Sequence, residues 1–342
     1  MQRRIAVVMA SLLVFGACLL PAGAVQQTPA DFYKGKNVEL YIGYSTGGGY
    51  DIYARLLARH MGKHIPGNPV IVPKNMDGAG SLRLANWLAR VAPKDGTVFG
   101  TIGRGIPFDP IMGGKGAQFK GTDFGWIGSA NDEVSVCVAW KDTGITKFED
   151  LYTKEMIVGG TGATADTDLF PKVINTVLGT KMKLVTGYPG GNDITLAMRR
   201  GEVQGRCGWS WSSIKTNHPD WVKDGTMKVL IQLALEKHPD MPNVPLIMDM
   251  VKTPEQKAIL RAVFARQALG RPFLAPPKLP ADRLAVLRKA FDDTMKDKEF
   301  LAEAEKMKLE ITPVPGEKVQ DIVAEVHRTP PEVLKKAAEA MR

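Results

Sequence analysis

A strand-like run, a glycine-rich turn and a helical pattern follow one another four times along this chain. The first copy occupies 38–44, 45–49 and 50–61. The other three turns lie at 75–80, 159–164 and 188–191. Alternation of this kind brings strands side by side in parallel, with helices covering the faces of the sheet. The sequence therefore predicts an α/β protein with largely parallel sheets.

The length and the charge pattern limit the possible organisation and partners. At roughly 150 residues per domain, 342 residues allow about two domains, and we find no long flexible linker between them. The formal net charge is +9, but charges of both signs are interspersed and no ladder of aromatic and basic residues is present. We therefore expect two lobes joined by short crossovers, no nucleic-acid partner, and a weak attraction for anions.

The N-terminus has the pattern of an export signal. Residues 1–4 are basic, 5–20 are apolar, and Ala22, Gly23 and Ala24 are small residues of the kind that a signal peptidase recognises. We expect a signal peptide over 1–24 and a mature protein in the periplasm. The alternative is a lipoprotein modified at Cys18.

The mature chain would keep two cysteines, Cys137 and Cys207, both within strand-like runs. Two thiols cannot form a disulfide framework, and neither has the spacing of a metal site. Two readings stay open: one disulfide in an oxidising compartment, or two buried, reduced thiols.

The glycine-rich turns are suited to anions. A turn without side chains lets backbone N–H groups approach a ligand, and the N-terminus of the following helix adds partial positive charge. The nucleotide versions of this motif are excluded by spacing, because Ile52 stands where the dinucleotide fingerprint needs glycine and no Gly-Lys-Ser/Thr follows. A small carboxylate is the favoured ligand, and no cofactor is expected.

Enzymatic and metal-binding readings are weaker. Residues 43–47 match the GxSxG nucleophile elbow at Ser45, but this elbow would lie on the first strand and leave no room upstream for an oxyanion loop. His60 and His64 are four residues apart without the glutamate of HExxH, and Gly62 interrupts their helix. We therefore expect neither catalysis nor a metal site, with a serine hydrolase using Ser45 as the alternative.

At these residues the sequence resembles the Bug family, the extracytoplasmic solute receptors of tripartite tricarboxylate transporters. Four motifs occur in the family's order over almost the whole mature chain. They are carried by Tyr44, Gly47, Gly48, Asp51 and Arg55; by Val72, Asn75, Gly78, Ala79 and Gly80; by Asp95, Gly96 and Thr97; and by Tyr188, Gly190, Gly191, Gly201 and Val203.

The resemblance implies a two-lobed, type II periplasmic-binding-protein fold of the Venus-flytrap kind. Lobe one would comprise 25–127 and 243–342, and lobe two 128–242. It implies a monomer that binds a small organic acid, such as a di- or tricarboxylate, in the interlobe cleft and delivers it to a two-subunit inner-membrane permease. A periplasmic sensor subunit for a signalling partner is the alternative.

The resemblance also implies the ligand-binding residues. Lobe one would contribute Ser45, Thr46, Gly47, Gly48, Gly49, Gly78, Ala79, Gly80 and Ser81, and lobe two Thr161, Gly162, Ala163, Thr164, Gly190, Gly191 and Asn192. Asp51 would cap its own helix or accept a hydrogen bond from the ligand. Arg104 would clamp a second carboxylate or lie on the surface.

Overall fold

The computed structural model describes residues 28–342. The predicted signal peptide over 1–24 and the alternative lipid attachment at Cys18 lie outside the described residues. Between 28 and 342, no helix is both long enough and apolar enough to cross a bilayer.

The first sheet has six strands in the order β11-β4-β10-β3-β1-β2. Their bounds are β1 (Asn37–Ile42), β2 (Val70–Asn75), β3 (Val98–Thr101), β4 (Gly125–Ser129), β10 (Pro272–Ala275) and β11 (Val314–Pro315). β1 pairs in parallel with β2 and β3, whereas β10 and β11 pair antiparallel with their neighbours. Because β10 and β11 come from the C-terminal third, the first lobe is built from two separate stretches of chain.

The second sheet has five strands in the order β7-β6-β8-β5-β9. Their bounds are β5 (Ser135–Trp140), β6 (Met156–Gly159), β7 (Met182–Val185), β8 (Gly205–Ser210) and β9 (Met227–Leu233). β6 pairs in parallel with β7 and β8, but β5 pairs antiparallel with β8 and β9. Both sheets are therefore mixed, which corrects the prediction of largely parallel sheets. The chain passes from the first sheet to the second between β4 and β5, and returns between β9 and β10. Each antiparallel pair contains at least one of these four strands.

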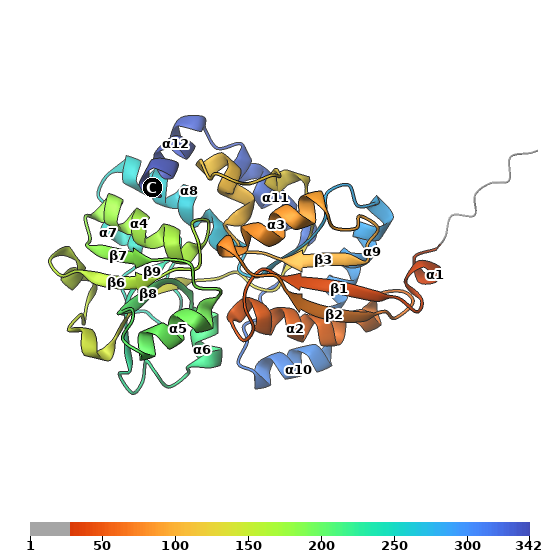
Figure 1. The fold of residues 1–342 in the computed structure, drawn as a ribbon, viewed down its shortest axis with the longest axis horizontal. Helices are drawn as coiled ribbons and strands as arrows, with labels where there is room; N and C mark the ends of the chain where they lie inside the picture. Colours follow the sequence, from red (N-terminus) through yellow and green to blue (C-terminus); the bar gives the residue numbers. More distant parts are fainter. Residues whose placement is uncertain (1–27) are drawn as a thin grey trace, which may run out of the picture.

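Helices cover both faces of each sheet, and the two lobes lie side by side (Figure 1). Around the first sheet lie α1 (Pro29–Tyr33), α2 (Gly49–Met61), α3 (Leu82–Arg90), α9 (Ala281–Thr294), α10 (Lys298–Lys306) and α11 (Gly316–His327). With the second sheet lie α4 (Asp166–Leu178), α5 (Gly191–Arg199), α6 (Trp211–Asn217) and α7 (Ile247–Met250). The fold is the predicted two-lobed type II architecture. The predicted lobe boundaries, after 127 and after 242, stay a prediction.

Two C-terminal elements connect the lobes. α12 (Pro331–Ala340) packs against α8 (Pro254–Phe264), against the 3₁₀ segment Ile106–Met112 beside the first sheet, and against α4 of the second. The core there is continuous, with Phe170 of α4 packed edge-on against Phe264 of α8. The C-terminal helix thus contacts both lobes.

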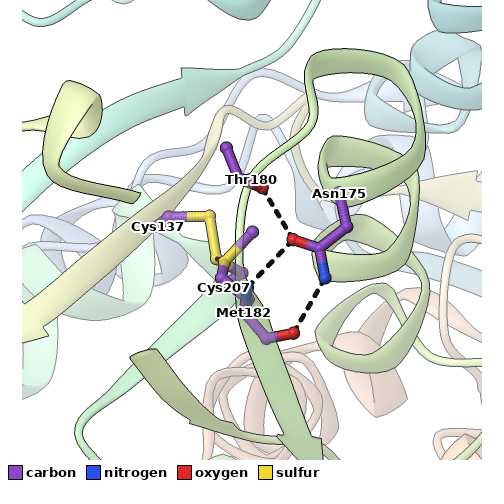
Figure 2. Close-up of a disulfide and its surroundings, with 5 residues drawn as sticks. All are labelled: Cys137, Asn175, Thr180, Met182 and Cys207. Atoms are coloured by element: carbon purple, nitrogen blue, oxygen red, sulfur yellow. Dashed lines mark hydrogen bonds between the residues drawn. A yellow bond between two sulfur atoms is a disulfide. The ribbon is translucent and has the colours of Figure 1, made fainter. Parts of the chain in front are cut away.

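Cys137 of β5 and Cys207 of β8 form a disulfide that closes a sequence separation of 70 residues. Both residues are fully buried. Figure 2 shows the bond beside Asn175 of α4, whose amide donates to the Met182 carbonyl and accepts from Thr180 Oγ1 and Met182 N. Of the two readings left open by the sequence, the structure has the disulfide.

Candidate ligand-binding site

A cavity of about 60 Å³ lies between the lobes. It is formed where β1, β3, β6 and β8 reach their carboxyl ends, the edge at which α/β proteins bind ligands. Lobe one contributes Tyr44, Gly48, Gly49, Tyr50, Gly103, Arg104, Gly105 and Arg271. Lobe two contributes Thr161, Thr164, Ala165, Asp166, Thr167, Gly191, Asn192, Arg206, Gly208, Trp209, Ser210, Ser213 and Asn217.

Three helices begin at this cavity. Gly49, Asp166 and Gly191, the first residues of α2, α4 and α5, all line it. None of the three N-cap residues makes a side-chain capping bond. Because the first-turn N–H groups of a helix have no partner within the helix, they remain available to a ligand, and the helix dipole favours an anion.

Two of the arginines lining the cavity are held by carboxylates of the protein. Arg104 Nε lies 3.0 Å from Asp166 Oδ2, and Arg271 Nη1 lies 3.3 Å from a Glu133 carboxylate oxygen. Arg271 also donates to Ser213 Oγ at 2.9 Å. These two guanidinium groups are nearly inaccessible to solvent and are compensated in place.

Arg206 differs from both. Its Nη1 donates to the Gly191 carbonyl at 3.1 Å, and its guanidinium lies 4.7 Å from the ring centre of Trp209. Its Nε is buried without a hydrogen-bond partner, as are the Nε atoms of Arg104 and Arg271. Three arginines line the cavity in the described part of the chain, and of these only Arg206 makes no ion pair with a carboxylate. Burial, with repulsion from Arg271 and Arg104, lowers the pKa of Arg206 to about 9, so the group is still charged at pH 7.

Sequence reasoning missed Arg206, although a signal was present. An arginine at the partly buried position of the otherwise buried strand β8 is unusual, because charged residues seldom occur in such strands unless they are paired or functional. The position of Arg206 also accounts for the glycine at 191, because a Cβ atom there would lie 2.7 Å from Arg206 Nη2. The small residue leaves room for the guanidinium.

Seven of the predicted site residues line the cavity, and eleven do not. Those that line it are Gly48, Gly49, Arg104, Thr161, Thr164, Gly191 and Asn192. Those outside the lining are Ser45, Thr46, Gly47, Asp51, Gly78, Ala79, Gly80, Ser81, Gly162, Ala163 and Gly190. The lining residues come from the β1–α2, β6–α4 and β7–α5 turns and from Arg104, and their contact with a ligand stays a prediction.

The β2–α3 turn over 78–81 packs against the β6–α4 turn instead of facing the cavity. Gly80 N donates to the Thr161 carbonyl at 3.1 Å, and Thr164 Oγ1 donates to the Ala79 carbonyl at 2.9 Å. A Cβ atom on Gly162 would lie 2.5 Å from Gly80 N. These glycines therefore allow the two lobes to touch, which is a different role from the expected contact with a ligand.

Asp51 is engaged entirely within lobe one. Its carboxylate accepts from Gly47 N at 2.8 Å, from Arg55 Nε at 2.8 Å and from Asn75 Nδ2 at 2.9 Å. Its carboxylate holds the glycine turn before α2 in place, but no side-chain capping bond is made at the start of α2. The predicted contact of Asp51 with a ligand stays a prediction.

Ser45 makes a bond between the lobes. Its Oγ donates to Asp193 Oδ2, in the first turn of α5, at 2.7 Å. Beside it, Asn217 Nδ2 donates to the Gly47 carbonyl at 3.4 Å. In the Ser-His-Asp arrangement that the GxSxG motif implies, the serine hydroxyl donates to an imidazole, whereas the partner of this hydroxyl is a carboxylate. These interlobe hydrogen bonds would stabilise a closed cleft.

Replacing Ser45 with alanine is expected to weaken ligand binding about tenfold, because a hydrogen bond to a charged group contributes about 1.5 kcal/mol to the closed form. Isothermal titration measures the change. Thr46→Val is the matched control, since the Thr46 hydroxyl bonds to Asn75 in its own lobe. An esterase activity that disappears in Ser45→Ala would instead support the hydrolase reading.

Two groups of histidine and acidic side chains have spacings that could hold a metal ion: His60, Asp297 and Glu299, and His238, Asp240 and Glu310. Each already contacts a lysine. Lys63 Nζ lies 2.7 Å from Asp297 and 2.6 Å from Glu299, and Lys215 contacts Asp240 and Glu310. Both groups are read as ion-pair networks, and neither supports a metal site.

Comparisons with known proteins agree with this architecture. The sequence matches no protein-family model. Over 93 residues it is 39% identical to the UPF0065 protein in the gbd 5′ region of Cupriavidus necator, a match that spans 27% of this chain and 28% of that protein.

Solved structures match over much more of the chain. The periplasmic binding protein BugD has a TM-score of 0.72 at 20% identity, covering 89% of this chain and 98% of its own. MatC from Rhodopseudomonas palustris, solved with malate, has a TM-score of 0.68 at 18% identity, covering 90% and 99%. Another R. palustris protein, solved with adipate, has a TM-score of 0.66 at 17% identity, covering 89% and 98%. The resemblance drawn from the sequence motifs is confirmed at the level of the fold.

Proposed function

We propose, from the premise that the chain has the fold of the Bug-family solute-binding proteins, that it captures a small carboxylate between its lobes. It would do so in the periplasm, after export by the N-terminal signal, and would deliver the acid to a two-subunit inner-membrane permease. The similar proteins MatC and the adipate-bound protein hold organic acids in this fold.

The observation that carries the proposal is the uncompensated guanidinium of Arg206 beside three uncapped helix N-termini. A carboxylate accepts two parallel N–H bonds from such a fork, and charge-assisted bonds of this kind are short and strong. The N–H groups at the starts of α2 and α5 come from opposite lobes, so one anion can bridge both. No covalent step is needed: the residues bind and orient the acid.

Closure of the cleft adds to the affinity. Removing water lowers the local dielectric constant and strengthens each contact to the anion. The interlobe bonds of Ser45, Gly80 and Thr164 then hold the closed shape. The permease would bind the closed conformation, so that it distinguishes the ligand-bound protein from the ligand-free one.

The proposal is tested by thermal shift on the mature chain, 25–342, with mono-, di- and tricarboxylates, aromatic acids and amino acids. At 100 times its dissociation constant, a ligand is expected to stabilise the protein by about 2.7 kcal/mol. The neutral amide of each active acid serves as control and is expected to have no effect, because it lacks the charge that Arg206 requires. No stabilisation by any acid would contradict the proposal.

A further inference from the structure

The charges around the cavity leave one cation without a counter-ion. Arg104 forms an ion pair with Asp166, whose Oδ2 lies 3.0 Å from Nε, and donates from Nη1 to Gln267 Oε1 at 2.7 Å and from Nη2 to Ser210 Oγ at 2.5 Å. Glu133 neutralises Arg271. The cavity therefore offers a ligand one free guanidinium.

Nearby ionisable groups outside the cavity lining do not give Arg206 a counter-ion. Asp166 also contacts Arg266, at 3.2 Å, and Arg266 shares a neighbouring cavity with Asp109. Burial raises the pKa of Asp109 to about 6, so this carboxyl is mostly ionised at pH 7. Burial lowers the pKa of His218, which lies near Arg206, to about 4, so His218 is neutral. Arg104, Arg266 and Arg271 thus each lie within ion-pair distance of a carboxylate, whereas among the described residues Arg206 makes no such pair.

The size of the cavity gives an independent limit. One water needs about 10–15 Å³ of such space, so about 60 Å³ holds roughly four to six water-sized groups. The rest of the lining is uncharged and includes the stacked rings of Tyr44 and Tyr50 and the hydroxyl groups of Thr161 and Thr167. A second carboxylate would need more space than these groups leave, and only helix N-terminal N–H groups, not a second unpaired guanidinium, would be there to replace its hydration.

We infer that this cavity selects a short acid with a single carboxylate, held by Arg206, with an aliphatic or hydroxylated remainder toward the tyrosines, and that it discriminates against dicarboxylates. The inference rests on the proposed function and narrows it. It also sets this chain apart from the similar proteins that hold the dicarboxylates malate and adipate.

The first test compares acids that differ mainly by one carboxylate: lactate with malate, and butyrate with succinate. Isothermal titration on the mature chain at pH 7 is expected to give dissociation constants at least tenfold lower for the monocarboxylate of each pair. Tighter binding of malate and succinate would overturn the inference and leave the proposed function intact. Binding of no acid at all, here or in the wider panel, would contradict the proposed function itself.

The second test changes the charge balance. Asp166→Asn releases the charge of Arg104 and is expected to shift the ratio of the two dissociation constants at least tenfold toward the dicarboxylate. Glu133→Gln removes the carboxylate that pairs with Arg271 and is expected to shift the same ratio in the same direction. Because Glu133 lies outside the cavity lining, it gives a second variant should Asp166→Asn fail to fold. Glu202→Gln, on the exposed surface of lobe two, removes one negative charge elsewhere and is the matched control. An unchanged ratio in both folded variants would overturn the inference.

Discussion

Replacing Arg206 with methionine is expected to weaken carboxylate binding by more than about 100-fold without destabilising the ligand-free protein. Losing one partner of a desolvated ion pair costs about 3 kcal/mol or more in binding. Without ligand, however, the wild-type protein carries a partly buried cation with no carboxylate partner, which is unfavourable. Methionine keeps an unbranched side chain and removes the charge, so the melting temperature of the ligand-free variant should equal or exceed that of the wild type.

The opposite signs of these two effects make the prediction specific. A merely structural arginine would lose stability and affinity together when replaced. Titration calorimetry measures the affinity, and thermal unfolding without ligand measures the stability. Arg200→Met is the matched control, because the Arg200 side chain is 63% exposed at the end of α5 and does not line the cavity. Retained affinity in Arg206→Met would remove the central support for the proposed site.

Loss of the disulfide is expected to lower the free energy of unfolding by about 4 kcal/mol. The bond between Cys137 and Cys207 closes a loop with a sequence separation of 70 residues, and the chain-entropy relation gives about that value for such a loop. The effect arises mainly in the unfolded chain, which becomes less constrained when the bond is absent. For a protein with a typical stability of about 5–15 kcal/mol, this is a large fraction.

The measurement is urea unfolding of the mature wild type and of the double variant Cys137→Ala/Cys207→Ala. Reductant should destabilise the wild type toward the value of the variant and should have no effect on the variant itself. Equal stability of the oxidised wild type and the double variant would show that the bond makes no net contribution.

The regular elements were predictable because their signals are local. A strand–turn–helix unit at 38–61 corresponds to β1 and α2, since the helical spacing of apolar residues and the glycines of the turn lie in one short segment. The mixed character of both sheets was not predictable in the same way. Strand direction in β5 and β10 depends on where the chain crosses between lobes, which no short segment encodes.

The candidate site was predictable only in outline. The turns before α2, α4 and α5 were identified from glycine spacing, because helix N-termini at the ends of strands have a recognisable pattern. The function of 78–81 as a contact between lobes was not, because it depends on Thr161 and Thr164 from another lobe. Arg206 was missed because its significance is the lack of a carboxylate partner, and a lack of partners can be established only when all neighbours are placed.

By itself, the amino-acid sequence determined the α/β class and the glycine turns at which helices begin, since these follow from periodicity and backbone freedom within short stretches; the two-lobed plan followed from the chain length and the family resemblance. Only the tertiary structure decided which turn residues face the cavity, how much space remains there, and which arginine stays uncompensated. The physical reason is that volume and charge balance are sums over side chains brought together from distant parts of the chain, so they exist only once both lobes have folded and met.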